Sequence, residues 1–296
     1  MSSNLTLVSI SYDPIPQSLG LALTEHANVL GITLHSSKAL LPQGKYFSER
    51  WTTATALLPE ARIALRDIAA DHGADLAFLS PGFKSQDVQI LAMDMDSTLI
   101  NIECIDEIAD FTGKKAAVSE ITAATMRGEI KDFKESLRRR VALLAGVSAD
   151  VLESVYKERL RSNSGAAELL ATANQRGLYT LLVSGGFTFF TEKLQKELGF
   201  KQAQANTLEI INGKLTGKVL GEIVDGAAKA AYLDGACALM NCHKSHAITI
   251  GDGSNDLPMM QGSGIAIAYR AKPIVKEKAD AAFDRVGLDA ALLLIA

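Results

Sequence analysis

The chain has 296 residues, of which 48% are hydrophobic and 22% are charged, a balance typical of folded globular proteins. The formal net charge of −4 gives no electrostatic reason to expect nucleic acid or an anionic membrane as a partner. Three cysteines without regular spacing do not indicate a disulfide framework, and the lack of Lys and Arg before residue 38 is unlike a signal peptide. No apolar run approaches the ~18 residues of a membrane span. These features and the length predict a soluble cytoplasmic protein with two cores.

The first 80 residues predict a small α+β unit. Strands are expected at 5–11, 32–41, 46–53 and 75–79, and helices at 17–30 and 57–72. The order strand–helix–strand–strand–helix–strand is that of the ferredoxin-like unit. A mostly polar run beginning with Pro81-Gly82 follows, so 81–87 is predicted to be a linker that leads to a second domain at 88–296.

The second domain predicts an α/β fold with a Rossmann-like parallel sheet. Short apolar runs at 88–93, 178–183, 247–250 and 264–268 alternate with helical segments, as in sheets covered on both faces. About 90 residues separate the ends of the first two strands, whereas a βαβ unit needs only ~30. Ser164 is the expected N-cap of the crossover helix at 166–176, and Gly177 is its expected C-cap. Residues 98–163 are therefore predicted to be a helical cap inserted after the first strand.

Two aspartates directly follow the first buried strand. Asp94 and Asp96 stand where open α/β sheets bind ligands, and their spacing allows both carboxylates to converge on one point. One could bind a cation and attack while the other transfers protons. A surface turn would explain this segment equally well on its own. A calcium-binding loop is disfavoured because Leu99 stands where an EF-hand needs glycine.

A second acidic loop, Gly251-Asp252-Gly253-Ser254-Asn255-Asp256, follows the strand at 247–250. It would bring four carboxylates to one edge of the sheet, and their mutual repulsion predicts a divalent cation among them. The alternative is a polar turn between a strand and a helix. That alternative weakens when the two acidic loops are considered together.

Two further features suit an anionic ligand. Ser184-Gly185-Gly186 ends the second strand before a helix, and a hydroxyl with backbone N–H groups at a helix N-terminus can bind an anion. A simple glycine turn has the same sequence pattern. Lys229 lies about one turn into a helix expected at 225–240, where a cation opposes the helix dipole at a cost of ~0.3–1 kcal/mol. An exposed lysine would tolerate that cost, whereas beside carboxylates and a phosphate Lys229 would balance charge.

The predicted cap contains one amphipathic helix with an arginine on its apolar face. The spacing of four, four and three residues defines this face, which consists of Phe133, Leu137, Val141 and Leu144. Arg140 lies on the same face and needs an anionic partner from the protein or a ligand, unless its guanidinium reaches solvent at the edge of the stripe. Glu103, near the start of the cap, could bind a ligand amine or be an ordinary exposed residue.

Together these motifs resemble the four signature motifs of haloacid dehalogenase-like phosphatases. Asp94-x-Asp96-x-Thr98, Ser184, Lys229 and the loop at 251–256 occur in the same order and at the same strand ends. The resemblance narrows to phosphoserine phosphatases through Glu103, the segment at 133–140 and Ser184-Gly185-Gly186-Phe187. The insertion resembles the cap of that family, and the first 80 residues resemble, in element order, the ACT-type regulatory domain of some bacterial members.

The resemblance implies hydrolysis of O-phospho-L-serine to L-serine and phosphate through an aspartyl-phosphate, the last step of serine biosynthesis. In that family, the residue matching Asp94 is the nucleophile, that matching Asp96 is the general acid and base, and that matching Thr98 fixes their loop. Mg²⁺ would be held by Asp94, Asp252 and the backbone carbonyl of Asp96. Asp256 would orient Lys229 or a metal-bound water.

The resemblance also implies a substrate pocket. The residues expected to contact the phosphate are Ser184, the N–H of Gly185, Lys229 and Asn255. Glu103 and Arg140 would bind the amino and carboxylate groups of the substrate, with Met126 and Phe133 as the apolar wall. An amino-acid effector at the N-terminal unit and a homodimer are further expectations. Two alternatives stay open: a phosphatase or phosphotransferase with another substrate, such as phosphohomoserine, and a serine-sensing module with a vestigial catalytic half.

Overall fold

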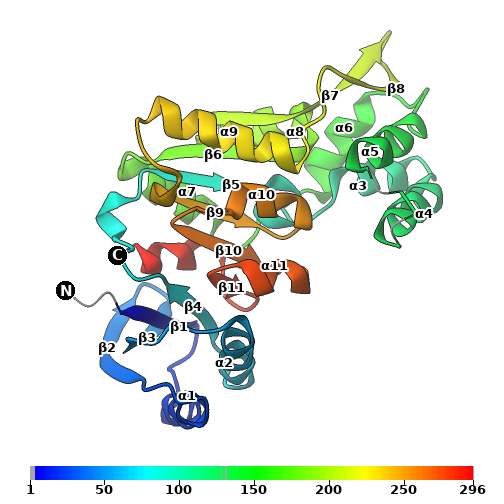
Figure 1. Ribbon diagram of the computed structural model, residues 1–296. Helices are drawn as coiled ribbons and strands as arrows, with labels where there is room; N and C mark the ends of the chain where they lie inside the picture. Colours follow the sequence, from blue (N-terminus) through cyan, green and yellow to red (C-terminus); the bar gives the residue numbers. More distant parts are fainter. Residues whose placement is uncertain (1–3, 128, 131, 296) are drawn as a thin grey trace.

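The computed structural model describes residues 4–127, 129–130 and 132–295, and for residues 37–43 and 126 it describes the backbone alone. Within these residues, eleven strands form one sheet in the order β2-β3-β1-β4-β11-β10-β9-β5-β6-β7-β8 (Figure 1). The strands are β1 (Leu5–Ser11), β2 (His35–Gln43), β3 (Tyr46–Thr53), β4 (Asp75–Leu79), β5 (Ile90–Met93), β6 (Tyr179–Phe187), β7 (Gln202–Ile211), β8 (Lys214–Leu220), β9 (Ala247–Gly251), β10 (Ile265–Tyr269) and β11 (Ala281–Phe283).

The α-helices are α1 (Gln17–Val29), α2 (Pro59–Asp71), α3 (Cys104–Phe111), α4 (Lys115–Met126), α5 (Phe133–Ala142), α6 (Asp150–Ser154), α7 (Ala166–Gln175), α8 (Thr188–Leu198), α9 (Gly226–Leu239), α10 (Leu257–Met260) and α11 (Pro273–Lys278). Shorter helical turns include η1 (Ser85–Asp87), η2 (Met95–Leu99), η5 (Ser254–Asp256) and η6 (Leu288–Leu294). No helix among the described residues is long and apolar enough to cross a membrane.

The N-terminal unit has the predicted element order. Its strands β2-β3-β1-β4 are antiparallel throughout. The bounds of β1, β3 and β4 agree with the sequence prediction, whereas β2 begins three residues later than expected. In β1, Leu5 and Leu7 join the apolar cluster that α1 and α2 cover. Val8 and Ile10 point to the opposite face, which is also buried, because successive side chains of a strand alternate between faces.

The N-terminal unit has an apolar core of its own, as predicted, but this unit is not separate from the rest of the chain. Strand β4 pairs antiparallel with β11, so one sheet continues from the N-terminal unit into the rest of the chain. The second face of the N-terminal sheet packs in the same apolar cluster as the C-terminal turn η6, with Val8 and Leu288 as members. Phe83, in the predicted linker, also packs against this cluster. The sequence offered no sign of this pairing, because β4 and β11 are about 200 residues apart.

The second part of the chain has the predicted α/β architecture. Strands β11-β10-β9-β5-β6-β7 are parallel neighbours, and β8 adds an antiparallel edge. In β5, Leu91 and Met93 face the layer that contains α7, α8 and η6, whereas Ile90 and Ala92 face α9. Cover on both faces explains why these strands are apolar without alternation. The β7–β8 hairpin and β11 were not among the predicted strands.

The crossover helix α7 begins differently from the prediction. Its N-cap is Gly165, with a φ of 81°, and not Ser164. The Ser164 carbonyl instead accepts a hydrogen bond from the Leu288 N–H at 2.8 Å. At the other end, Arg176 is the C-cap, and Gly177 follows it with a φ of 75°. The left-handed backbone at both glycines explains why glycine occurs there.

The helical insertion lies beyond the carboxyl ends of the core strands and contains α3 to α6 (Figure 1). A β-bridge between Ile100 and Ser162 closes its base. The β7–β8 hairpin supports one side, because the Leu215 carbonyl accepts from Gly146 N–H and the Leu215 N–H donates to the Val147 carbonyl, both at 2.8 Å. The cap therefore rests on two parts of the core.

Candidate active site

Asp94 directly follows β5, at the carboxyl edge of the sheet. Its Oδ1 accepts a hydrogen bond from the Met95 N–H at 2.8 Å, which fixes the carboxylate at the start of η2. Ser97, in the same loop, has a φ of 57°, a left-handed conformation that is uncommon outside glycine. The Ser97 hydroxyl donates to Glu103 Oε1 at 2.7 Å. Such backbone strain is found preferentially at functional sites, where the surroundings enforce it.

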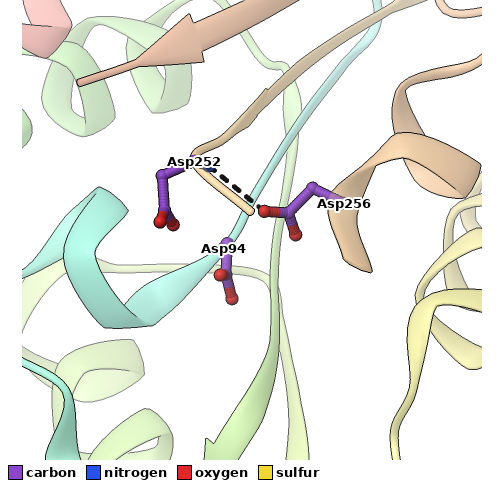
Figure 2. A group of neighbouring side chains, drawn as sticks. All are labelled: Asp94, Asp252 and Asp256. Carbon is purple, nitrogen blue, oxygen red and sulfur yellow. Dashed lines mark hydrogen bonds between the residues drawn. The ribbon is translucent and has the colours of Figure 1, made fainter. Parts of the chain in front are cut away.

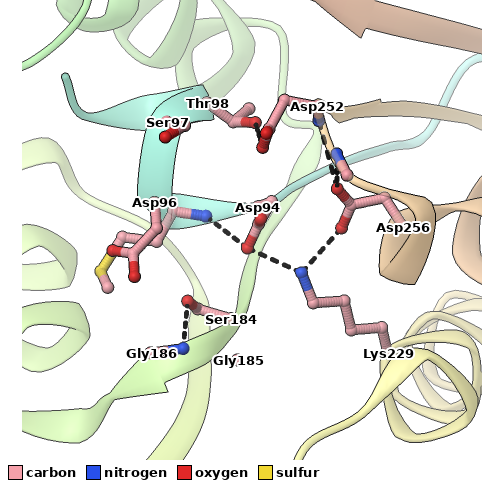
Figure 3. A network of polar contacts seen from close by, with 12 residues as sticks. Asp94, Asp96, Ser97, Thr98, Ser184, Gly185, Gly186, Lys229, Asp252 and Asp256 are labelled. Carbon is pink, nitrogen blue, oxygen red and sulfur yellow. Dashed lines mark hydrogen bonds and ion pairs between the residues drawn. The ribbon is translucent and has the colours of Figure 1, made fainter. Parts of the chain in front are cut away.

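Lys229 reaches from α9 to lie between two carboxylates (Figure 3). Its Nζ is 2.7 Å from Asp94 Oδ1 and 2.7 Å from Asp256 Oδ1, and the side chain is fully buried. Burial by itself would lower the lysine pKa, but Asp256 and Asp94 together raise it above its ordinary value. Lys229 is therefore charged, and its unfavourable place in the first turn of α9 is offset by two ion pairs.

The second acidic loop faces the first. Asp256 Oδ2 accepts from the backbone N–H groups of Asp252 and Gly253, at 3.1 and 3.0 Å, and the former bond is drawn in Figure 2. Asp252 Oδ1 accepts from the Thr98 hydroxyl at 3.0 Å. These bonds tie the loop after β9 to the loop after β5, as expected for neighbouring parallel strands.

Asp94, Asp252 and Asp256 each offer an oxygen within 4.8 Å of the others, so the three carboxylates form one cluster (Figure 2). Three ionised carboxylates with one ammonium, that of Lys229, leave an uncompensated negative charge in a buried place. Burial, followed by the charge of Asp256, raises the pKa of Asp252 to about 7. Burial and the charge of Asp256 also raise the pKa of Asp94. Oxygen ligands with excess negative charge fit a hard divalent cation.

Asp96 is buried beside this cluster, and its carboxyl group can hold a proton near neutral pH. Burial, with the charge of Glu103, raises its pKa to about 8. Its Oδ2 accepts a long hydrogen bond of 3.4 Å from the Cys104 N–H, and among the described residues its buried Oδ1 has no hydrogen-bond partner. A buried carboxyl group with a raised pKa and an unused oxygen is suited to general acid–base chemistry.

The glycine-rich end of β6 packs tightly against the aspartate loop. A Cβ at Gly186 would lie 2.7 Å from Met95 Cε and 3.0 Å from Asp96 Oδ2, so a side chain does not fit there. The Gly186 N–H donates to the Ser184 hydroxyl oxygen at 2.8 Å. A Cβ at Gly185 would lie 3.0 Å from Phe133 of the cap. Strand β6 extends through this segment to Phe187, a little farther than predicted.

Sequence reasoning missed two buried asparagines that hold these loops. Asn206 of β7 donates to the Gly185 carbonyl and accepts from the Val224 N–H, both at 2.8 Å. Asn163 donates to the carbonyls of Thr98 and Ile100, at 2.8 and 3.0 Å. Neither asparagine lies near its partners in sequence, and a lone asparagine in a strand or loop gives no recognisable pattern.

The cap residues of the predicted pocket are placed as follows. Glu103 is exposed at the N-cap of α3, and its charge acts on Asp96. Arg140 is half-buried in α5, and burial lowers its pKa while Asp106, Glu103 and Asp96 oppose this. Among the described residues, no carboxylate lies within ion-pair distance of Arg140. The side chain of Met126, at the end of α4, lies outside the described part.

Asn255 and Lys134 complete the surroundings of the site. Asn255 is half-buried in η5, and its Oδ1 would lie only 2.3 Å from a Cβ at Gly253, so its side chain folds back over that glycine. Lys134 of the cap forms an ion pair of 3.3 Å with Asp225, the N-cap of the helix that carries Lys229. The cap therefore contacts the core directly at the site.

The haloacid dehalogenase-like hydrolase family matches residues 91–261, which is more than half of the chain. The chain belongs to this family. Over 220 residues, this haloacid dehalogenase-like hydrolase is 51% identical to a phosphoserine phosphatase of Polaromonas sp., an alignment that covers 73% of this chain and 93% of the relative. The matched range contains both acidic loops, Ser184 and Lys229.

Solved structures resemble the hydrolase over nearly its whole length. A HAD family hydrolase from Salmonella enterica serovar Typhi has a TM-score of 0.85 at 29% identity, covering 98% of each chain. A probable phosphoserine phosphatase from Vibrio cholerae, in its unliganded form, has a TM-score of 0.79 at 33% identity, covering 98% of this chain and 86% of the other. Both coverages extend over the N-terminal unit of this haloacid dehalogenase-like hydrolase.

Proposed function

We propose that this chain is a Mg²⁺-dependent phosphoserine phosphatase that hydrolyses O-phospho-L-serine to L-serine and phosphate, the closing step of serine biosynthesis from phosphorylated precursors. The observation that carries the proposal is the half-buried Arg140, whose Nε donates only a long bond of 3.4 Å to the Ser136 carbonyl and which forms no ion pair with any described residue. It belongs to a cap that packs against the core beside the buried Asp94, Lys229 and Asp256. The 51% identity to a relative of that name supports the same substrate.

The chemistry follows from the places of Asp94 and Asp96. An Asp94 oxygen attacks phosphorus, the bond from phosphorus to the serine oxygen breaks, and Asp96 gives its proton to that oxygen. Asp96, now ionised, then takes a proton from the water that attacks the aspartyl-phosphate, and this step releases phosphate and restores Asp94. A carboxyl group whose pKa is about 8 can serve both steps near neutral pH.

The chain's own donors would bind the phosphoryl group. Ser184, the N–H of Gly185 and Lys229 lie at the same sheet edge as Asp94, where they would contact the equatorial oxygens. Asn255 would contact the substrate phosphate from the facing loop. Thr98 keeps the two acidic loops in register through its bond to Asp252.

Asp94, Asp252 and the backbone carbonyl of Asp96 would hold Mg²⁺. The carboxylate of Asp256 is already used by Lys229 and two backbone N–H groups, so its role would be to orient Lys229 or a metal-bound water. When bound, Mg²⁺ would neutralise the approach of one anion to another. The positive charge of Lys229 would help to neutralise the same negative charge.

The cap would select the serine part of the substrate. Arg140 would pair with its carboxylate and Glu103 with its amino group, which gives each charged side chain an opposite partner. Phe133, packed at Gly185, and Met126 would form the apolar wall beside the serine carbon atoms. Closure of the cap would bring these contacts and exclude bulk water in the same movement.

Arg140→Ala tests the substrate assignment. Phosphate release from O-phospho-L-serine and from p-nitrophenyl phosphate is measured with Mg²⁺ and with EDTA. Loss of one charge-assisted contact, worth ~1.5–3 kcal/mol, should lower kcat/KM for phosphoserine by ~10–100-fold and leave the aryl ester within about threefold. Arg138→Ala, an exposed arginine of the same helix, is the matched control. Equal losses on both substrates, or activity only on other esters, would discard the serine pocket.

The N-terminal unit is proposed to be an ACT-like domain that binds an amino-acid effector, and the protein to form homodimers in the cytoplasm. The β2-β3-β1-β4 order supports the domain assignment, and three free cysteines in the described part suit a reducing compartment. Calorimetry with serine should use the full chain, because the N-terminal sheet shares a core with η6. Light scattering gives the oligomeric state.

A further inference from the structure

The cap joins the core through two adjacent segments that leave and return beside the catalytic loop. Asn163, on the returning segment, donates its side-chain amide to the carbonyls of Thr98 and Ile100, at 2.8 and 3.0 Å. Its backbone N–H donates to the Leu99 carbonyl at 2.8 Å. A β-bridge between Ile100 and Ser162 completes this cap hinge. The position of the returning segment therefore affects both the cap and the loop of Thr98.

The segment that follows Asn163 is held by the C-terminal part of the chain. The Leu288 N–H donates to the Ser164 carbonyl at 2.8 Å. A Cβ at Gly165 would lie 1.9 Å from Asp289 Oδ1 and 2.7 Å from Asp289 N, so the Gly165 backbone rests directly on Asp289. Asp289 therefore fills the space that a side chain at residue 165 would need, and a displacement of Asp289 toward Gly165 would move the base of the hinge.

Asp289 is in turn held by the N-terminal unit. The Tyr46 hydroxyl donates to Asp289 Oδ1 at 2.5 Å and accepts from the Gly287 N–H at 3.1 Å. Lys45 Nζ lies 3.0 Å from Asp289 Oδ2. Tyr46 is only 4% exposed, and its hydroxyl also lies 3.5 Å from the Tyr12 hydroxyl.

We propose that Tyr46, a residue of the N-terminal unit, is a positioning residue for the cap hinge and acts through Asp289. The contacts run without interruption from Tyr46 to Asp289, Gly165, Asn163 and the loop of Thr98. Coupling between the N-terminal unit and the cap requires an element whose position both of them affect, and the hinge is that element. Through it, the state of the N-terminal unit sets how readily the cap closes on substrate.

A displaced hinge should affect two kinds of substrate differently, and this expectation rests on the proposed function. The core would bind the phosphate, whereas Glu103 and Arg140 of the cap would bind the serine part. A displaced hinge should therefore raise KM for phosphoserine more than it changes turnover of an ester that lacks these groups. Hydrogen exchange at the hinge amides tests the coupling even if phosphoserine is not the substrate.

The experiment compares Tyr46→Phe with Arg66→Met in the full chain. Tyr46→Phe removes only the hydroxyl. Arg66→Met removes a different contact between the same parts of the molecule, because Arg66 donates to the carbonyls of Lys276 and Ala279, at 2.5 and 2.7 Å, far from the hinge in sequence. Thermal unfolding of both variants verifies that each remains folded at the assay temperature.

For Tyr46→Phe we expect KM for phosphoserine to rise about fivefold, as for the loss of one ordinary hydrogen bond, with kcat within about twofold. The backbone amides of Asn163 and Leu288, which donate the hinge hydrogen bonds, should exchange faster. Arg66→Met should leave both readouts unchanged. The proposal is overturned if Tyr46→Phe leaves hinge exchange and KM unchanged, or if Arg66→Met changes them equally. Absence of phosphoserine turnover in the unaltered protein, with faster hinge exchange in Tyr46→Phe, would reject the substrate and support the coupling.

Discussion

Replacement of Lys229 by methionine should destabilise the metal-free protein and abolish turnover. The ammonium lies 2.7 Å from Asp94 and 2.7 Å from Asp256, and none of the lysine side chain is exposed. Methionine keeps the length and the apolar packing of the side chain but removes the charge. The two carboxylates then lose the cation they share, and one of them must take up a proton to remain buried.

The size of this effect is bounded by the work of protonating a carboxyl group. Against an unfolded pKa of ~3.9, that work is about 4 kcal/mol at pH 7 and about 1.5 kcal/mol at pH 5. Loss of one partner of a buried pair is worth ~3–5 kcal/mol, so protonation sets the limit at the lower pH. We therefore expect Lys229→Met to lose about 3–4 kcal/mol at pH 7 and about half of that or less at pH 5.

Urea unfolding in EDTA at the two pH values measures this difference, and phosphate release measures turnover. The double variant Lys229→Met/Asp256→Asn is the matched control, because the neutral amide removes one of the stranded charges. It should be more stable at pH 7 than Lys229→Met alone. A loss below about 1 kcal/mol at pH 7, or a loss that does not depend on pH, would refute the charge-balance reasoning for this site.

Two further predictions concern the carboxylates themselves. Asp94→Asn should abolish phosphate release while the free energy of unfolding in EDTA stays equal or rises, because burial and Asp256 already raise the pKa of Asp94 and favour a neutral group; retained turnover would remove Asp94 as the nucleophile. Without metal, the pKa values of Asp96 and Asp252 in the folded protein are about 8 and about 7. The folded protein therefore keeps protons on these two carboxyl groups at pH values above about 4, where the unfolded chain has lost them. Stability should therefore fall as pH rises from about 4 to about 8, by up to ~1.4 kcal/mol per pH unit for each retained proton, with a shallower slope in Asp96→Asn or in excess Mg²⁺. A flat profile in EDTA would contradict the raised pKa values.

Local signals in the sequence determined most of the elements. Runs rich in apolar residues located β1, β3 and β4 at their observed bounds, and the interval between the first two buried strands of the second domain predicted the inserted cap. Buried parallel strands also predicted the site, because side chains that follow such strands meet at one sheet edge. Asp94, Asp252 and Asp256 do meet there, with Lys229 between two of them.

Elements without a local signal were missed or displaced. The N-cap of α7 is Gly165 rather than Ser164, because the Ser164 carbonyl bonds to Leu288 and a side chain at residue 165 would collide with Asp289. The residues next to this turn in the sequence give no indication of its contacts with Leu288 and Asp289. Asn206 likewise bonds to Gly185 and Val224, which lie on other parts of the fold.

The sequence by itself determined which chemistry the site can support, because that depends on residue types at the ends of strands. Only the tertiary structure decided how the N-terminal unit is attached. The pairing of β4 with β11 and the contact of Tyr46 with Asp289 join residues more than 200 positions apart. A strand edge pairs with a strand that fits it and satisfies its free backbone hydrogen-bonding groups, and a buried hydroxyl likewise needs a partner. Such edges and buried positions exist only after each part of the chain has folded.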